Sequence, residues 1–196
     1  MLTMIEGETA ARIAAAAGAI LVAEGVEAVT MRRVAEAVGV TPMAIYRHFP
    51  NRDALLRAVA DASFREMAGY WGRRGADGGW EAHMDGLLHD FLDFALSRPH
   101  LYTFLMTDQR EEARRFPEDF RGGGAMPFSH VVEGIEQGMR EGRLRPDDPL
   151  EVAMAVIGLV QGLVQLYLGN RIGMSEQEFR SLCERCAWRM VNGLTR

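Results

Sequence analysis

The sequence predicts an all-α protein of about nine helices, arranged as a three-helix N-terminal head and a larger helical body. Apolar residues recur three and four positions apart in one segment after another, which is the spacing of one face of an α-helix. Several segments open with a capping residue followed by proline, or by glutamate three positions later. No segment alternates β-branched and polar residues between turns, so we expect no strand. We place the boundary after residue 54, which gives units of residues 1–54 and 55–196.

The composition is that of a globular chain, with 48% hydrophobic and 25% charged residues. A net charge of −5 excludes a protein that binds polyanions by its bulk charge, but residues 30–57 alone carry a net charge of +3. Positive charge is therefore concentrated on one segment, where contact with nucleic acid would be expected. The longest apolar run, residues 152–160, is shorter than the roughly 20 residues that span a bilayer. We expect a cytoplasmic protein that makes no membrane contact.

The first predicted helix covers residues 8–24 and ends at Gly25. Two short helices, joined by a tight turn, follow in residues 30–50. Thr30 is a good N-cap for the first of them, and Gly39 can take the left-handed conformation that ends it. Thr41 and Pro42 together open the second, because threonine caps a helix and proline fits its first position.

The second short helix has two different faces. Ile45 and Phe49, four residues apart, face inward, while small, aromatic and cationic side chains remain on the outer face. The outer face consists of Met43, Ala44, Tyr46 and Arg47. Such a helix suits the DNA major groove, which is about 12 Å wide and admits one helix. From these residues alone, a helical hairpin without a ligand remains the alternative.

Residues 41–56, with the sequence TPMAIYRHFPNRDALL, resemble the DNA-binding head of TetR-type transcriptional regulators. The resemblance extends over roughly residues 8–60. It implies a helix-turn-helix head that binds double-stranded operator DNA, usually palindromic, and a body that binds a small-molecule effector and forms a homodimer. A repressor released from its operator by the effector is the expected function. An activator or a ligand-independent regulator with the same head is the alternative.

The candidate DNA contacts divide into two groups. Side chains with hydroxyl or cationic groups can hold phosphates, and these are Thr30, Arg32, Arg33, Thr41, Tyr46, His48 and Arg52. Side chains at the start and on the outer face of the second helix can reach base edges, and these are Thr41, Met43, Ala44 and Arg47. Pro42, the first residue of that helix, is also expected at the DNA. The alternative for His48 is a partly buried ring beside Phe49.

The body supplies large apolar side chains with a few polar groups among them, which is the composition of a small-molecule pocket. The candidate lining residues are Met67, Trp71, Phe91, Phe94, Tyr102, Phe104, Phe128, Gln161 and Gln165. Plain hydrophobic core is the alternative for each of them. We expect no cofactor and no metal.

The helix predicted for residues 148–168 is apolar nearly all round, so it should be buried on every side. Gly158 and Gly162, four residues apart, would let another helix approach closely. With the helix that begins at Ser175, this segment resembles the dimer-forming pair of TetR-type proteins, which predicts a homodimer through residues 150–194. A core helix within a single chain is the alternative.

Two further clusters suggest other chemistry. Asp85, His89 and Asp93 lie four residues apart on one helical face. We interpret them as a solvated polar face, because the Glu-x-x-His pairs of a dimetal helical bundle are absent, and a metal-binding protein or a helical enzyme is the alternative. Cys183 and Cys186 lie three residues apart without the partners of a zinc or thioredoxin-type site. We interpret both cysteines as ordinary helix positions, with a redox-responsive pair as the alternative.

Overall fold

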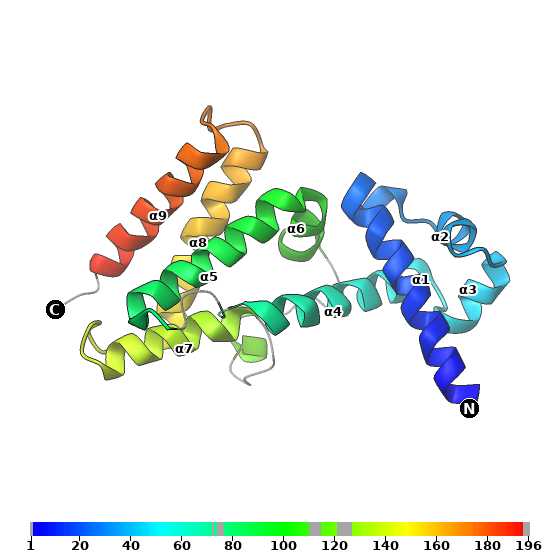
Figure 1. The fold of residues 1–196 in the computed structure, drawn as a ribbon, viewed down its shortest axis with the longest axis horizontal. Helices are drawn as coiled ribbons and strands as arrows, with labels where there is room; N and C mark the ends of the chain where they lie inside the picture. The colour runs from blue at the N-terminus through cyan, green and yellow to red at the C-terminus, as the bar shows by residue number, and fades with distance from the viewer. Residues whose placement is uncertain (1, 72, 74–76, 110–114, 121–126, 194–196) are drawn as a thin grey trace. The chain divides into compact units, whose positions relative to one another are not determined.

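A computed structural model describes residues 2–71, 73, 77–109, 115–120 and 127–193. These residues form α-helices and two short 3-10 turns, with no strand among them, so the all-α prediction is confirmed (Figure 1). The helices are α1 (Leu2–Glu24), α2 (Met31–Val38), α3 (Pro42–His48), α4 (Arg52–Tyr70), α5 (Gly79–Ser97), α6 (Pro99–Met106), α7 (Pro127–Arg140), α8 (Pro149–Leu168) and α9 (Glu176–Asn192). The 3-10 turns are η1 (Val26–Ala28) and η2 (Glu118–Phe120).

The chain divides into two compact units. The first contains residues 1–66 and 98–110, and the second contains residues 67–97 and 111–196. This partition differs from the predicted boundary after residue 54, because α4 continues as one helix beyond it and α6 packs on α1. The compact units are defined by packing, whereas the predicted boundary is functional, and the functional boundary stays a prediction.

The first unit is built on α1. Ile13, Ala17 and Leu21 of this helix are fully buried, as are Val34 of α2 and Ile45 of α3. The helix begins at Leu2, six residues before its predicted start. Residues 2–7 contain no proline, and their only weak helix former is Gly7, so the helix can extend through them.

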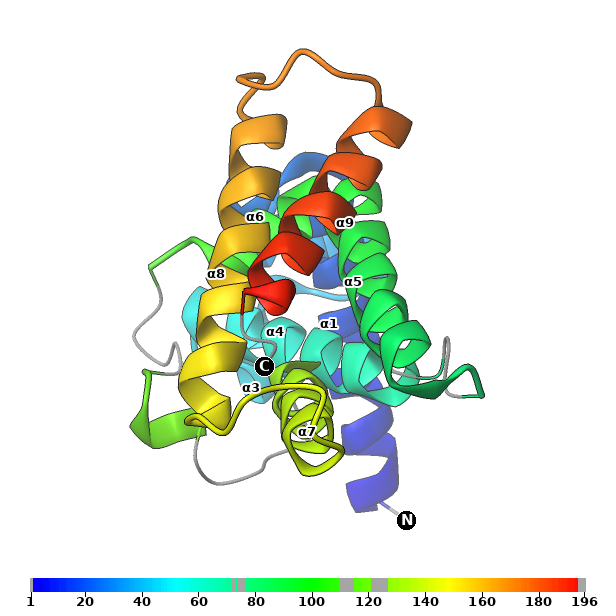
Figure 2. The same ribbon diagram turned by 90° about the vertical axis from the view of Figure 1, so that its left-hand side faces the viewer.

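The second unit packs α7 and α9 on α8, with α5 against α7 and α9 (Figure 2). Its core gathers side chains from all four helices, among them Trp80, Ile135, Val156 and Val191. A Cβ atom added to Gly138 of α7 would lie 2.8 Å from the Trp80 ring. Only glycine therefore allows α7 to approach this indole so closely.

Helix α8 begins as the sequence predicts but is not buried on every side. The Asp148 carboxylate accepts hydrogen bonds from the Leu150 and Glu151 amides at 2.8 and 3.2 Å. One face of the helix is buried in the core through Val152, Ala153, Val156, Val160 and Val164. The opposite face is exposed at Ala155, Gly158, Gly162 and Leu166. The prediction of burial on all sides is therefore wrong for a single chain, because no other element covers this face among the residues that the structure describes.

By length and composition, α8 is the one described helix that could cross a membrane, and 28% of its most apolar 18-residue window is buried. A helix buried in a core or against a second protein chain passes the same test. The exposed glycines at positions 158 and 162 suit close helix packing.

Candidate functional site

Local capping positions the two short helices of the first unit. The Thr30 hydroxyl accepts a hydrogen bond from the Arg33 amide at 3.2 Å, and Thr41 accepts one from the Ala44 amide at 3.3 Å. Gly39 has a φ of 74°, the left-handed conformation that ends α2. All three predictions are confirmed, and together they fix a short turn between the helices.

Helix α3 has the two faces that the sequence predicts. Ile45 is fully buried and Phe49 is 9% exposed, so the inner face anchors the helix in the core. On the outer face, Met43 is 68% exposed and Tyr46 is 48% exposed, and Arg47 is exposed as well. The outer face of α3 therefore presents an apolar, a phenolic and a cationic side chain to any molecule that binds it.

The other predicted contact residues lie in different surroundings. Thr30, Arg32, Thr41 and Pro42 are exposed, whereas Ala44 and His48 are half-buried. Each threonine hydroxyl accepts an amide hydrogen bond as a cap, which leaves its own O–H available to donate to a phosphate. Partial burial of His48 agrees with the alternative interpretation of that residue as a ring beside Phe49.

Arg52 is engaged within its own unit, and its phosphate contact stays a prediction. Its Nε donates to the Val29 carbonyl at 2.8 Å, and its Nη2 donates to the Val26 carbonyl at 2.6 Å. The guanidinium is thus turned into its own unit, where it holds the chain between α1 and α2 against α4. Its structural role was not visible in the sequence, because the two carbonyls lie 23 and 26 residues away.

Arg33 is also engaged within the protein. Its guanidinium forms an ion pair with Glu24 at the end of α1, and both side chains are partly exposed. A surface ion pair of this kind is weak. Arg33 can therefore exchange Glu24 for a phosphate at small cost, whereas Arg52 would have to give up two hydrogen bonds.

Two short helices joined by a left-handed glycine, the second with one face in the core and the other in solvent, define a helix-turn-helix protein of the DNA-binding type. The family model for bacterial regulatory proteins of the tetR family matches residues 13–59. The model for the tetracyclin repressor-like C-terminal domain matches residues 84–190. The chain belongs to the tetR family of bacterial regulatory proteins.

Two curated relatives are named as transcriptional repressors. The chain is 35% identical over 101 residues to the HTH-type transcriptional repressor DrrR1 of Streptomyces coeruleorubidus, which covers 50% of this chain and 35% of DrrR1. It is 28% identical over 142 residues to the HTH-type transcriptional repressor Rv1474c of Mycobacterium tuberculosis, which covers 69% of each chain. The matched part thus spans about a third of DrrR1 and two thirds of Rv1474c.

The fold agrees with solved structures over nearly the whole chain. A TetR-family transcriptional regulator from Pectobacterium atrosepticum superposes with a TM-score of 0.73 at 19% identity, covering 98% of this chain and 96% of the other. At this identity, the likeness establishes the fold alone.

Four of the nine predicted effector-binding residues come together in the second unit. Met67, Trp71 and Phe94 are buried, and Phe91 is half-buried. The Trp71 ring meets the Phe91 ring at 6.0 Å and 85°, and the Phe94 ring at 6.5 Å and 65°. Both contacts are edge-to-face, the arrangement that aromatic rings prefer.

The other five predicted residues lie on α6, α7 and α8. Tyr102 and Phe104 are buried within the first unit, and Phe128 packs on Phe120 with ring centroids 4.8 Å apart. Gln161 is half-buried, whereas Gln165 is exposed on α8. The exposure of Gln165 contradicts its place in an interior pocket, because position 165 lies on the side of α8 that faces away from the core.

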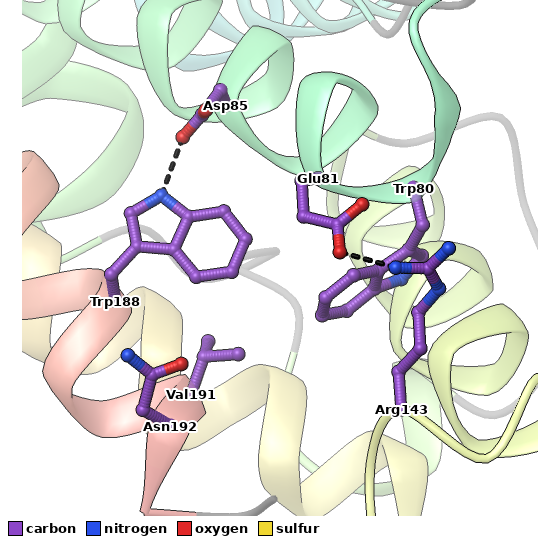
Figure 3. A pocket seen from close by; sticks show the side chains of 7 residues that line it. All are labelled: Trp80, Glu81, Asp85, Arg143, Trp188, Val191 and Asn192. Atoms are coloured by element: carbon purple, nitrogen blue, oxygen red, sulfur yellow. Dashed lines mark hydrogen bonds and ion pairs between the residues drawn. The ribbon is translucent and has the colours of Figure 1, made fainter.

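Sequence reasoning missed a hollow of about 480 Å³ in the second unit, lined by Trp80, Glu81, Asp85, Arg143, Trp188, Val191 and Asn192 (Figure 3). The Trp80 and Trp188 rings meet edge-to-face at 5.9 Å. Arg143 is paired with Glu81 and lies 5.8 Å from the centre of the Trp80 ring. These residues come from α5, α9 and the turn before α8, so no local sequence pattern brings them together.

The three residues considered for a metal instead join α5 to α9. Asp85 accepts from the Trp188 indole at 2.6 Å, His89 lies 3.1 Å from the Glu184 carboxylate, and Asp93 accepts from Arg180 at 2.7 Å. The pairs advance by four residues in opposite directions, as expected of two antiparallel helices. Among the described residues no group of three His, Cys, Asp or Glu side chains could hold a metal ion. The motif that suggested a metal-binding protein or an enzyme is therefore a polar helix-to-helix contact.

The two cysteines differ in environment. Cys183 is buried in the core and Cys186 is half-buried, and neither forms a disulfide. Burial raises the pKa of the Cys183 thiol to about 12, with a smaller contribution from the neighbouring Cys186 and Glu184. A redox role requires an accessible thiolate, which Cys183 does not offer.

Proposed function

We propose that the protein is a transcriptional repressor that binds a palindromic operator as a homodimer and is released by a small-molecule effector. The observation that carries this proposal is the exposed face of α3, with Met43, Tyr46 and Arg47 opposite a buried anchor. Family membership and two relatives named as repressors support it. A protein that acts on chromosomal DNA works in the cytoplasm, which we take as its location.

Within this proposal the outer face of α3 enters the major groove. Arg47 can donate two hydrogen bonds to guanine, and Met43 or Ala44 can contact a thymine methyl group. Tyr46, Thr41, Thr30 and the nearby arginines hold phosphates, which positions the helix without reading sequence. Residues 1–54 are the proposed DNA-binding unit, and residues 55–196 the proposed effector and dimer unit.

The exposed face of α8 supports a dimer through residues 150–194. A Cβ atom added to Gly158 or Gly162 would meet nothing within 4 Å, so packing inside the chain does not require glycine there. Each glycine in a helix costs about 1 kcal/mol relative to alanine. Glycine at both positions would allow the α8 of a second copy to approach closely, which would explain why these residues are glycine. Two heads in such a dimer would contact half-sites about 34–36 Å apart.

The proposal is tested by selecting bound sequences from random DNA with the purified protein. We expect a palindromic motif whose enrichment falls as salt rises, because phosphate contacts release counterions. Arg47→Ala should relax preference at one base pair of each half-site, by about 1–3 kcal/mol. Arg145→Ala, at an exposed arginine in the turn before α8, is the control and should leave the motif unchanged. Absence of any selected motif would refute the proposal, and an unchanged motif with Arg47→Ala would refute the role of Arg47.

A further inference from the structure

The Trp71 indole has a buried hydrogen-bond donor with nothing to bind. The residue is 6% exposed. Its Nε1 atom is buried and has no hydrogen-bond partner in the described part of the chain. The other two tryptophans are satisfied, since Trp80 donates to the Gly134 carbonyl at 2.7 Å and Trp188 donates to Asp85. An unpaired buried N–H costs free energy, so native proteins rarely retain one without a functional reason.

Two phenylalanine rings contact this indole. Phe91 and Phe94 meet it edge-to-face, and Met67 precedes it by four residues on α4, with a side chain that is 1% exposed. A thioether sulfur is a weak acceptor at most, and phenylalanine rings carry no conventional acceptor. The missing partner must therefore come from outside this group of four residues, hereafter the Trp71 cluster.

We propose that the Trp71 cluster is the part of the effector site that recognises an uncharged aromatic molecule through a single acceptor oxygen, which receives the Trp71 Nε1–H. This inference rests on the proposed function, because it assigns a chemical class to the effector assumed there. The indole nitrogen only donates, so the effector must supply the acceptor. The phenylalanine edges favour a flat ring system, which they can contact in the same edge-to-face manner.

The charge of the ligand follows from the same surroundings. A carboxylate would exchange water for aromatic edges and one indole N–H, which does not compensate an ion for its lost hydration. This cost disfavours an anionic ligand and leaves neutral ketones, ethers and esters of aromatic compounds.

The hollow between Trp80 and Trp188 is the rival site, and its polar groups favour the Trp71 cluster instead. Both indole nitrogens there already donate, Glu81 is paired with Arg143, and Asp85 accepts from Trp188. A ligand entering this hollow would find both indole donors already engaged within the protein. At the Trp71 cluster the donor is already desolvated, so a ligand acceptor gains a hydrogen bond without paying for its exposure to water.

The test compares three ketones with hydrocarbons of the same shape: acetophenone with cumene, 1-tetralone with tetralin, and fluorenone with fluorene. Calorimetric titration of the full-length protein should show at least one ketone binding tenfold or more tightly than its hydrocarbon. This ratio should fall close to one in Trp71→Phe, which keeps an aromatic ring and removes the N–H. Trp188→Phe, which removes a satisfied indole, should keep the ratio. Equal binding of ketone and hydrocarbon in all three pairs overturns the inference.

A second measurement does not depend on the Trp71 variant folding. The three indole N–H signals of the ¹⁵N-labelled protein are assigned from Trp80→Phe and Trp188→Phe, which leaves Trp71 by elimination. A bound ketone should move the Trp71 signal downfield, and its hydrocarbon should not. Movement of the Trp80 or Trp188 signal instead overturns the inference.

Operator affinity measured in the same titrations separates the two proposals. Ketone binding with the expected preference but unchanged operator affinity supports the site and contradicts release by an effector. Sequence-specific DNA binding without any ketone preference contradicts the site alone and leaves the DNA-binding proposal intact.

Discussion

At the scale of single residues, Arg52 lies where the sequence suggests a DNA contact, but its side chain makes hydrogen bonds within the protein. Its position next to the helix-turn-helix suggested a phosphate contact, yet the guanidinium holds the Val26 and Val29 carbonyls. These two hydrogen bonds tie the start of α4 to Val26 in η1 and to Val29 directly after it. Arg52 therefore braces the first unit.

Arg52→Met should lower the free energy of unfolding by about 2 kcal/mol, because two charge-assisted hydrogen bonds are lost and two carbonyls lose their partner. Urea denaturation measures this change. Arg32→Met, at an exposed arginine of α2, is the matched control and should change stability by less than about 0.5 kcal/mol. If Arg52→Met is as stable as the control, the bracing role is wrong.

The two cysteines should differ in reactivity. A folded pKa of about 12 for Cys183 leaves only about one thiol in 10⁴ ionised at pH 8, whereas thiolate is the reactive form. Iodoacetamide at pH 8 should therefore alkylate Cys186 alone in the native protein, and both residues in urea, as read by peptide mass spectrometry. Labelling of native Cys183 at the rate of Cys186 would contradict its burial.

The same pKa has a consequence for stability. Because the pKa of folded Cys183 lies above the ordinary thiol pKa of 9.0, the folded state binds the proton more tightly between pH 9 and 12. The contribution of Cys183 is therefore fully present below pH 9 and is lost as pH rises toward 12. Cys183→Ala should flatten the fall in unfolding free energy over that range.

At the scale of helices, local signals predicted the structure well and long-range partners were not predicted. Thr30, Gly39 and Thr41 set helix ends through atoms within three or four residues, so their roles could be read from neighbouring sequence. The capping box of Ser175 and Glu178 is confirmed for the same reason. The early start of α1 was missed because residues 2–7 contain neither a strong stop nor a strong start.

Spacing alone could not distinguish a metal site from a contact between helices. Asp85, His89 and Asp93 share one face of α5 in either case, and the choice depends on which residues the opposite helix presents. Helix α9 presents Trp188, Glu184 and Arg180, about 90 to 100 residues further along the chain. The Trp71 donor was hidden in the same way, because its lack of a partner is a property of tertiary packing.

The contact between α5 and α9 predicts an energetic coupling between Asp93 and Arg180. Their side chains lie 2.7 Å apart and are partly exposed, so a double-mutant cycle with Asp93→Asn and Arg180→Met should give about 0.5–1 kcal/mol. The coupling should shrink at 1 M salt, where charges are screened within about 3 Å. Asp93→Asn combined with Arg145→Met is the control and should be additive. A coupling no larger than the control would show that the pair does not join the two helices.

At the scale of the whole molecule, the exposed face of α8 links the fold to the proposed function. A recognition helix of seven residues, the length of α3, reads few base pairs, so specificity requires two heads in fixed register. The dimer that provides the register should bury the apolar side of α8 that a single chain leaves in solvent. Effector binding at the Trp71 cluster could then alter DNA affinity through α4, which contributes residues to both compact units.

Gly158→Leu should therefore separate dimerisation from folding. Leucine favours helix more than glycine, and a Cβ at position 158 meets nothing within 4 Å, so the single chain should fold at least as well. The larger side chain would keep a second α8 from approaching, which should shift the mass by light scattering from twice 21.8 kDa toward 21.8 kDa. Gly69→Leu is the matched control, since Gly69 is also an exposed helical glycine with open space around it, and should stay dimeric.

A monomeric wild type, or a Gly158→Leu variant as dimeric as Gly69→Leu, would refute this interface. Operator affinity should fall together with the dimer, because each head alone keeps only half of the contacts.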